Sequence, residues 1–313
     1  MQKENINMNI VDGGLGDMIG YLVAADYNIR NYPHVQFHVW VPDFLLDLAK
    51  HVLPKGSLVR PFSKAKHKYN EKLPGITTAW TSFHTPMRTH PVDYGFHMLT
   101  DKHIYDISQK NYLQIRPDEI DLNRFKLPKK YVVICSAAAA KVKEMPINTF
   151  NSIVDYTLQK GYQPVFLGKR VSETGVEGLK ITADPIEADY SKGIDLLDKT
   201  NLLEAAAIMS KARCVIGMDG GLIHLAGMTM APIIAGYTFA DPEHLMPIRY
   251  DFIGYNVHPI VPDENKCRFC QTNSNFVFGI DFRDCFKNKD YECQKDMTAK
   301  KFIEKMDKVL KND

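Results

Sequence analysis

The sequence predicts an α/β protein of two domains, each built on a parallel β-sheet. Its 313 residues exceed what one hydrophobic core usually supports. Short apolar runs with strand character alternate with helical patterns, which is typical of βαβ units. This alternation stops at residues 115–130, where charges and prolines gather without an apolar period, and then begins again. We interpret that segment as the linker and predict domains at 1–126 and 127–313.

In the first half, the expected elements follow one another closely. The patterns predict strands in "NMNIVD" and "VQFHVWV", a helix from about Asp17 to Tyr32, and another in "DFLLDLAKHV". Residues 62–91 lose this alternation and are rich in Lys, His, Thr and Pro. Long loops of this kind in α/β proteins often form acceptor or substrate surfaces.

In the second half, strands are expected in "YVVICSA", "QPVFLG", "RCVIGMD" and "PIIAGY", and helices in "NTFNSIVDYTLQKG", in "NLLEAAAIMSKA" and from Gly221. The last segment, "MTAKKFIEKMDKVLK", predicts an amphipathic helix with Phe302, Ile303, Met306 and Leu310 on one face. Ligands of open parallel sheets bind beyond the carboxyl ends of the strands. We therefore expect the site in a cleft between the two domains.

Composition argues against several classes of partner. The formal net charge is +2, so there is no strong electrostatic case for a nucleic-acid or membrane partner. No apolar run approaches the roughly 20 residues of a transmembrane helix, and the N-terminal "MQKENINMNI" lacks the apolar centre of a signal peptide. The expected location is cytoplasmic.

The loop "IVDGGLGDMIG" differs from a dinucleotide-binding fingerprint. Its glycines read Gly14-x-Gly16-x-x-x-Gly20, one residue longer than G-x-G-x-x-G. Asp17 stands at the expected helix start, where a carboxylate would compete with phosphate for the positive end of the helix dipole. This disfavours a nicotinamide dehydrogenase. Asp17 is either a helix cap or has a role other than holding a cofactor.

A second glycine turn follows the predicted strand that ends at Met218. Asp219-Gly220-Gly221 leads directly into a helix that carries His224. The glycines allow a sharp turn and leave backbone N–H groups unobstructed, which suits a diphosphate. The alternative is a tight structural turn with Asp219 as helix N-cap and His224 packed on the helix.

Lys141 and Lys143 lie just after another predicted strand and before a helix. Lysines at this position can reach a ligand in the cleft as compact positive charges. They could equally be solvated loop residues.

These motifs occur in an order that resembles one family. The stretch "DLLDKTNLLEAAAIMSKARCVIGMDGGLIHLAG", preceded by "KVKEMP" and by the N-terminal "GGLGD", resembles the heptosyltransferase-like glycosyltransferases of glycosyltransferase family 9. The resemblance implies the GT-B fold, in which an N-terminal Rossmann-like acceptor domain faces a C-terminal Rossmann-like nucleotide-sugar domain across a cleft. It also implies a terminal helix that packs back across the first domain.

The resemblance also implies roles for individual residues. Asp17 would be the general base that takes the proton of the acceptor hydroxyl. Lys143 would offset charge on the leaving diphosphate, and Met145 stands where the family often has Trp. The residues implied in nucleotide-sugar binding are Gly16, Lys141, Lys143, Asp219, Gly220, Gly221, Leu222 and His224.

The implied reaction is inverting sugar transfer. A heptose or similar sugar would pass from a nucleotide-diphospho-sugar such as ADP-heptose to a hydroxyl of a glycan or lipopolysaccharide, with no catalytic metal. The same chemistry on a protein or a modified DNA base is an alternative, although the near-neutral charge argues against DNA. A non-catalytic nucleotide-binding module is the alternative of another class. The sugar, the acceptor and the oligomeric state stay open.

The six cysteines are of two kinds. Cys135 and Cys214 lie in apolar runs and are expected to be buried. The others have the spacing Cys267-x2-Cys270-x14-Cys285-x7-Cys293, which suits a tetrahedral four-thiolate site for structural zinc or iron. Related glycosyltransferases often carry cysteines in this region, and some bind iron through them. Free thiols or a disulfide are the alternatives.

Overall fold

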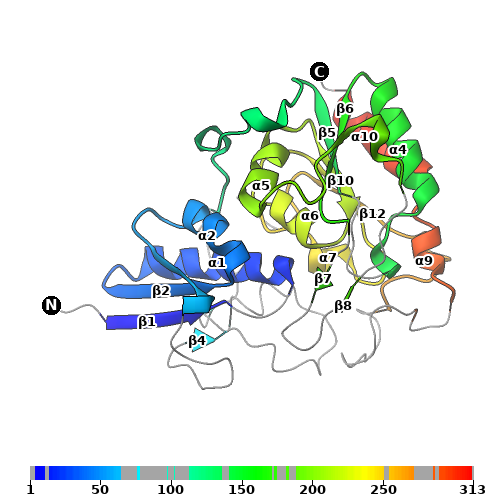
Figure 1. Ribbon diagram of the computed structural model, residues 1–313. Coiled ribbons are helices and arrows are strands. Elements are labelled where there is room, and N and C mark those ends of the chain that lie inside the picture. The colour runs from blue at the N-terminus through cyan, green and yellow to red at the C-terminus, as the bar shows by residue number, and fades with distance from the viewer. Residues whose placement is uncertain are drawn as a thin grey trace.

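The structure is a computed structural model in which two α/β domains lie side by side (Figure 1). The described residues are 4–10, 14–64, 76–77, 97, 102, 113–135, 141–170, 173–174, 181–182, 188–249, 254–270, 285 and 289–311. Both domains have the predicted parallel sheets.

The first domain contains a four-stranded parallel sheet with the strand order β3-β2-β1-β4. Its strands are β1 (Glu4–Asn9), β2 (Val35–Val41), β3 (Leu58–Pro61) and β4 (Ile76–Thr77). Its helices are α1 (Leu15–Asn31), a short 3-10 turn η1 (Asp43–Leu45) and α2 (Leu46–Val52). Alternate residues of β2, namely Phe37, Val39 and Val41, are buried, because successive side chains of a strand point to opposite faces.

The second domain contains a six-stranded parallel sheet with the order β12-β11-β10-β5-β6-β9. The strands are β5 (Tyr131–Cys135), β6 (Gln163–Leu167), β9 (Ile194–Asp195), β10 (Val215–Met218), β11 (Ile233–Gly236) and β12 (Val257–Ile260). Chain order runs outward from β5 in one direction and from β10 in the other. A topological switch point therefore lies between β5 and β10, where ligands of such sheets bind.

Helices and short turns complete the second domain. They are η6 (Lys141–Lys143), α4 (Ile147–Gln159), η7 (Tyr190–Lys192), α5 (Leu202–Lys211), α6 (Gly221–Ala226), α7 (Pro242–Leu245), α9 (Glu292–Lys295) and α10 (Ala299–Leu310), with a two-stranded ribbon of β7 (Glu173–Thr174) and β8 (Ile181–Thr182). All residues of β5 and of β10 are buried, because helices cover both faces of a parallel sheet.

Helix α10 lies in a different place from the one implied by the family resemblance. It packs against α4, β11 and β12 of the second domain, so the expectation that it crosses back over the first domain is wrong. The reason is its apolar stripe: Phe302, Met306 and Leu310 are buried in the same cluster as Phe150 of α4. Ile303 is only partly buried. The helix completes the core of its own domain.

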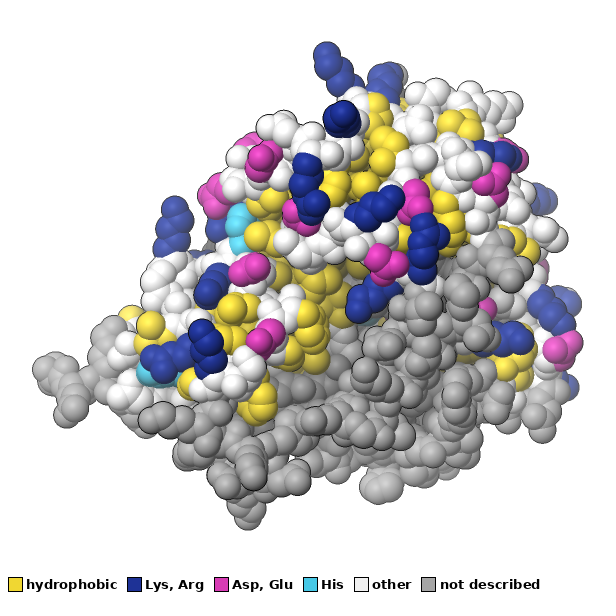
Figure 2. Space-filling view, viewed as in Figure 1, with side chains coloured by type: hydrophobic (Ala, Val, Ile, Leu, Met, Phe, Trp, Pro, Cys, Tyr) yellow, Lys and Arg dark blue, Asp and Glu magenta, His cyan; other side chains and the backbone are white. Residues whose placement is uncertain are grey.

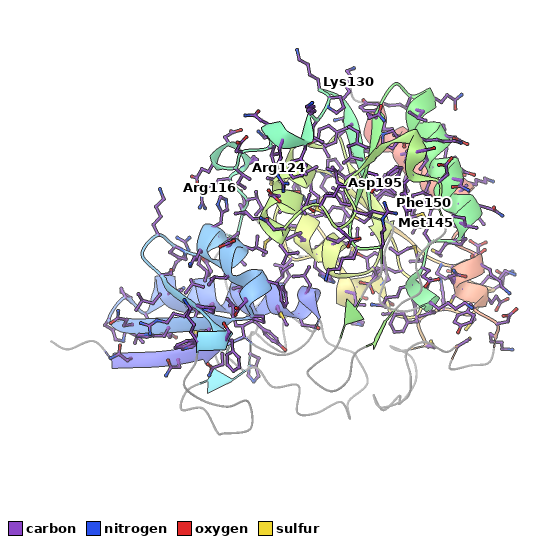
Figure 3. All side chains as sticks on the ribbon, viewed as in Figure 1. Arg116, Arg124, Lys130, Met145, Phe150 and Asp195 are labelled. Atoms are coloured by element: carbon purple, nitrogen blue, oxygen red, sulfur yellow. The ribbon has the colours of Figure 1, made fainter. Side chains whose placement is uncertain are left out.

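The linker is bonded to both domains. The Ile115 N–H donates to the carbonyl of Met228 in the second domain over 3.0 Å, and the Arg116 N–H donates to His51 Nε2 in the first over 3.0 Å. Further along, Arg124 pairs with Glu204 of α5 over 2.7 Å. Arg116 and Arg124 mark this connection in Figure 3. The segment predicted as linker contains the 3-10 turns η4 (Pro117–Glu119) and η5 (Asn123–Phe125).

Among the helices that the structure describes, none has the length and apolar character needed to cross a membrane.

Candidate active site

The site forms where the N-terminal turns of α1 and α6 meet, at the junction of the two domains. A β-carbon on Gly16 would stand 2.6 Å from the His224 ring, and one on Gly221 would stand 2.8 Å from the β-carbon of Leu15. Real β-carbons do not approach so closely, so both glycines permit the contact. The two glycine motifs of the sequence therefore face each other.

Asp17 lies in the first turn of α1, and its carboxylate accepts the Gly14 N–H over 2.8 Å. The residue is partly exposed but densely surrounded, and this burial raises the pKa of the carboxyl. The Gly14 N–H, His224 and the positive charge of Lys143 act in the opposite direction. Gly14 is the N-cap of α1, and the Asp17 carboxylate reaches back to its N–H from the third helical position while it faces Lys143, Asp219 and His224 of the second domain.

Lys143 and Asp219 form an ion pair across the switch point. Lys143 belongs to the turn η6 that follows β5, and Asp219 directly follows the neighbouring strand β10. The Lys143 Nζ lies 2.7 Å from Asp219 Oδ2. Burial acts against ionisation of Asp219, but the charges and hydrogen bonds of Lys143 and His224 outweigh it and hold the pKa at about 2. Asp219 is therefore ionised at neutral pH.

His224 lies next to the same ion pair. Its Nε2 lies 3.8 Å from Asp219 Oδ1, and its side chain is mostly buried. The alternative role of Asp219 as helix N-cap is wrong, because Gly220 occupies that position in extended backbone geometry. Asp219 instead lies just before the cap, and the His224 side chain is its partner on α6.

The remaining expected ligand residues differ in position. Lys141 is exposed and places its Nζ 5.1 Å from the centre of the Tyr291 ring. It thus extends toward the cysteine segment, whereas Lys143 extends toward Asp219. Gly220 has open space beside it, since an added β-carbon would meet nothing nearer than the Met218 carbonyl at 3.8 Å. Leu222 is partly exposed in the first turn of α6.

Met145 is a core residue. Only 3% of it is exposed, and it belongs to the buried cluster that contains Phe150. Both residues are labelled near the start of α4 in Figure 3. The side chain at this position, where the family resemblance implies a Trp, therefore packs inside the second domain.

Sequence reasoning missed three residues at the carboxyl end of β11. Tyr237 is buried beneath Asp219, and burial together with the Asp219 charge raises the pKa of its hydroxyl. Thr238 bonds to the backbone of Val142, and Phe239 lies under the Lys143 ammonium. Their position directly after the predicted strand could have indicated them, because ligands gather beyond the carboxyl ends of parallel strands.

The cysteines of the C-terminal segment lie beside the turn η6, which carries Lys141 and Lys143 and is called the lysine turn below. Cys270 and Cys293 are buried in one cluster with Val142 and Phe239, while Cys267 and Cys285 are partly exposed. All four are free thiols, as are the buried Cys135 and Cys214. In the part of the chain that the structure describes, no three or more Cys, His, Asp or Glu side chains are arranged as a metal-binding group. The expected four-thiolate site stays a hypothesis.

Charges of both signs are mixed on one face of the protein. On the face shown in Figure 2, Lys and Arg side chains of the described residues lie among Asp and Glu side chains. This distribution agrees with the net charge of +2.

A family model described as glycosyltransferase family 9 (heptosyltransferase) matches residues 75–265, more than half of the chain. The chain belongs to glycosyltransferase family 9. The match includes Lys143, Asp219 and His224 of the site. Asp17 and the cysteine segment lie outside the matched range of this family 9 protein.

Sequence identity to individual proteins is low. Lipooligosaccharide heptosyltransferase 2 of Haemophilus influenzae is 24% identical over 106 residues, which cover 34% of this family 9 chain and 30% of that protein. The iron-containing dodecameric glycosyltransferase TibC from enterotoxigenic E. coli H10407 has a TM-score of 0.74 at 14% identity, over 99% of this chain and 77% of that one. TibC is also known in complex with ADP-D-β-D-heptose.

A second solved structure, E. coli ADP-heptose LPS heptosyltransferase II, has a TM-score of 0.64 at 14% identity over 98% of both chains. At this identity the structural likeness shows the fold. The two parallel sheets of the family 9 chain thus match the architecture of these heptosyltransferases, as the family resemblance predicted.

Proposed function

We propose that this protein is an inverting glycosyltransferase that uses a nucleotide-diphospho-heptose, in chemistry close to ADP-heptose, as its donor. The observation that carries the proposal is the meeting of Asp17 with Lys143, Asp219 and His224 at the junction of the domains. One carboxylate with a raised pKa stands on the first domain. The ion pair of Lys143 and Asp219 faces it from the switch point of the second domain.

The donor would bind at the carboxyl ends of β5 and β10. Lys143 would face the diphosphate as a compact positive charge. The open backbone beside Gly220 leaves space for a ligand to approach the turn. Asp219 would hold Lys143 in place, since their Nζ and Oδ2 atoms are 2.7 Å apart. The names of the similar structures, which include ADP-heptose, support this choice of donor.

The transfer step would use Asp17 as general base. Asp17 takes the proton of the acceptor hydroxyl while that oxygen attacks the anomeric carbon. The bond from the anomeric carbon to the diphosphate breaks at the same time, and the nucleoside diphosphate departs with the electron pair. Lys143 would offset the charge that develops on the leaving group. Because attack comes from the face opposite the leaving group, the anomeric configuration inverts. The acceptor we propose is a hydroxyl of a glycan or lipopolysaccharide.

The cysteine segment would hold a structural zinc or iron. Burial, together with the smaller repulsion from the nearby Cys267, Cys270 and Cys285, raises the pKa of Cys293 to about 12. A bound cation would relieve this repulsion, which is why the four sulfurs fit such an ion. Cys267, Cys270, Cys285 and Cys293 would be its ligands, and the ion would order the segment around them.

Transfer itself tests the function. The protein is incubated with a panel of nucleotide sugars, and binding is measured as a rise in the unfolding temperature, because a ligand of the folded state stabilises it. Donors that bind are then offered with heptose-containing oligosaccharide acceptors, and the anomeric configuration of the product is determined by NMR. We expect ADP-heptose to bind and the product to have the opposite configuration. Retention of configuration, or binding without transfer to any acceptor in the panel, would contradict the proposal.

A further inference from the structure

The turn that carries Lys143 is held from behind by the chain that follows β11. Thr238 is 2% exposed, and its hydroxyl donates to the carbonyl of Val142 over 2.8 Å. Val142 stands between the two lysines of the turn and is itself buried. The bond therefore holds the middle of the turn at a fixed distance from the end of β11.

The next residue contacts Lys143 directly. The Phe239 ring lies with its centre 4.9 Å from the Lys143 Nζ, within the range of a cation–π contact. Phe239 also packs against Val142, Cys270 and Cys293 in a separate buried cluster. The Phe239 ring and the Thr238 hydroxyl thus both contact the turn η6.

The cysteine segment is bonded to the same support. The Phe269 N–H donates to the carbonyl of Thr238 over 3.0 Å. On the other side of the turn, the Tyr291 ring lies 5.1 Å from the Lys141 Nζ. The turn is therefore enclosed between the end of β11 and the cysteine segment.

A three-residue 3-10 turn has little stability of its own, since so short a turn is not supported by successive backbone bonds; its Glu144 N–H donates to the Lys141 carbonyl over 3.0 Å. Its position must come from tertiary contacts. We propose that Thr238 and Phe239 are positioning residues, which place the Lys143 ammonium where it meets Asp219 and the donor diphosphate. The proposal rests on the donor role proposed for Lys143.

The test is a double-mutant cycle read by ADP binding. Isothermal titration gives the dissociation constant of ADP for wild type, Lys143→Ala, Thr238→Val and the double variant. We expect Thr238→Val to weaken ADP binding about three- to tenfold, the usual effect of one lost hydrogen bond. In the Lys143→Ala background the same change should have almost no further effect, because coupled residues are not additive. Thr238→Ser, which keeps the hydroxyl, should restore binding.

A matched control separates positioning from general stability. Thr157 is also fully buried, and its hydroxyl donates to the Ile153 carbonyl over 2.7 Å inside α4, away from the site. Thr157→Val should lower the unfolding temperature about as much as Thr238→Val and leave ADP binding unchanged. If Thr238→Val fails to fold, Phe239→Leu takes its place in the cycle, since it keeps an apolar side chain and removes the aromatic face.

The outcomes distinguish two failures. If Lys143→Ala binds ADP as wild type does, the proposed donor site is wrong. If Lys143→Ala weakens binding but neither Thr238→Val nor Phe239→Leu does, the positioning role is wrong and the donor site stands. Equal losses from Thr238→Val with and without Lys143 also overturn the positioning role, because Thr238 would then act independently of the lysine.

Discussion

Gly16 and His224 lie against each other across the domain junction so closely that a β-carbon on Gly16 would stand 2.6 Å from the imidazole. One residue belongs to the first turn of α1 and the other to α6. The contact brings Asp17, the next residue along α1, toward the charges of Lys143 and Asp219. This relationship makes the geometry of the site sensitive to a single methyl group.

Gly16→Ala should therefore destabilise the junction. The added methyl overlaps the His224 ring, and overpacking of this kind costs about 1–3 kcal/mol. We expect a lower unfolding temperature and reduced transfer activity. In a His224→Ala background, where the ring is gone, the same change should cost almost nothing in stability. An equal loss in both backgrounds would show that the close contact is not what excludes a side chain at Gly16.

Asp17→Asn should lower transfer by about two to four powers of ten, the usual contribution of a general base. The amide still accepts the Gly14 N–H, so ADP binding should change little.

The raised pKa of Asp17 also predicts a pH profile. Since the base must be deprotonated, kcat/KM should rise with pH through a value above the ordinary 3.8. Lys143→Ala removes a positive charge that lowers this pKa, so the acidic limb of the profile should move to higher pH.

The same shift has a consequence for stability. The folded protein holds the Asp17 proton more tightly than the unfolded chain does, because burial raises the pKa. Stability is then lost as pH rises from the unfolded value through the folded one, and at neutral pH the charged form is unfavourable. Asp17→Asn should unfold at a higher temperature than wild type at pH 7. The difference should vanish near pH 3, where both states are protonated. A variant less stable than wild type at pH 7 would contradict the interpretation that burial disfavours the charged form of Asp17.

Lys143→Ala should destabilise the second domain, because it leaves Asp219 buried without its cation. Leaving a buried group without its partner costs about 1–3 kcal/mol, to be measured by urea unfolding. Adding Asp219→Asn should recover part of the loss, since the uncompensated charge is removed. Lys192→Ala is the control: its pair with Asp155 is 2.6 Å long but exposed on both sides, and such solvent-screened pairs contribute little to stability. Equal losses from both lysines would argue against a special role for the buried pair.

The cysteine hypothesis predicts metal in the purified protein. Elemental analysis under reducing conditions should find about one equivalent of zinc or iron, as expected if four thiolates close one tetrahedral shell. Replacing Cys267 and Cys270 by Ser together should remove it, whereas Cys214→Ala, in the core, should leave it bound. ADP affinity should also fall in the double variant, because Cys270 packs against Val142 of the lysine turn. Metal-free protein with four reactive thiols would rule the site out.

Much of the fold was predictable because it depends on local patterns. The alternation of β2 and the fully apolar runs of β5 and β10 are visible in the chain, and the structure confirms them. Six strands were missed: β3, β4, β7, β8, β9 and β12. They are short, and β12 contains His258 and Pro259, which weaken the strand pattern. Neighbouring strands supply the pairing that their own sequence does not signal.

By itself the sequence determined the order of the longer strands and helices, the two glycine turns and the residue types that follow them, since each depends on neighbours along the chain. Tertiary structure decided which side chains meet. Lys141 and Lys143 are two residues apart, yet one faces Tyr291 and the other pairs with Asp219. The raised pKa of Asp17 and the place of α10 were decided in the same way. Burial, charge and packing depend on segments distant in sequence, and only folding brings those segments together.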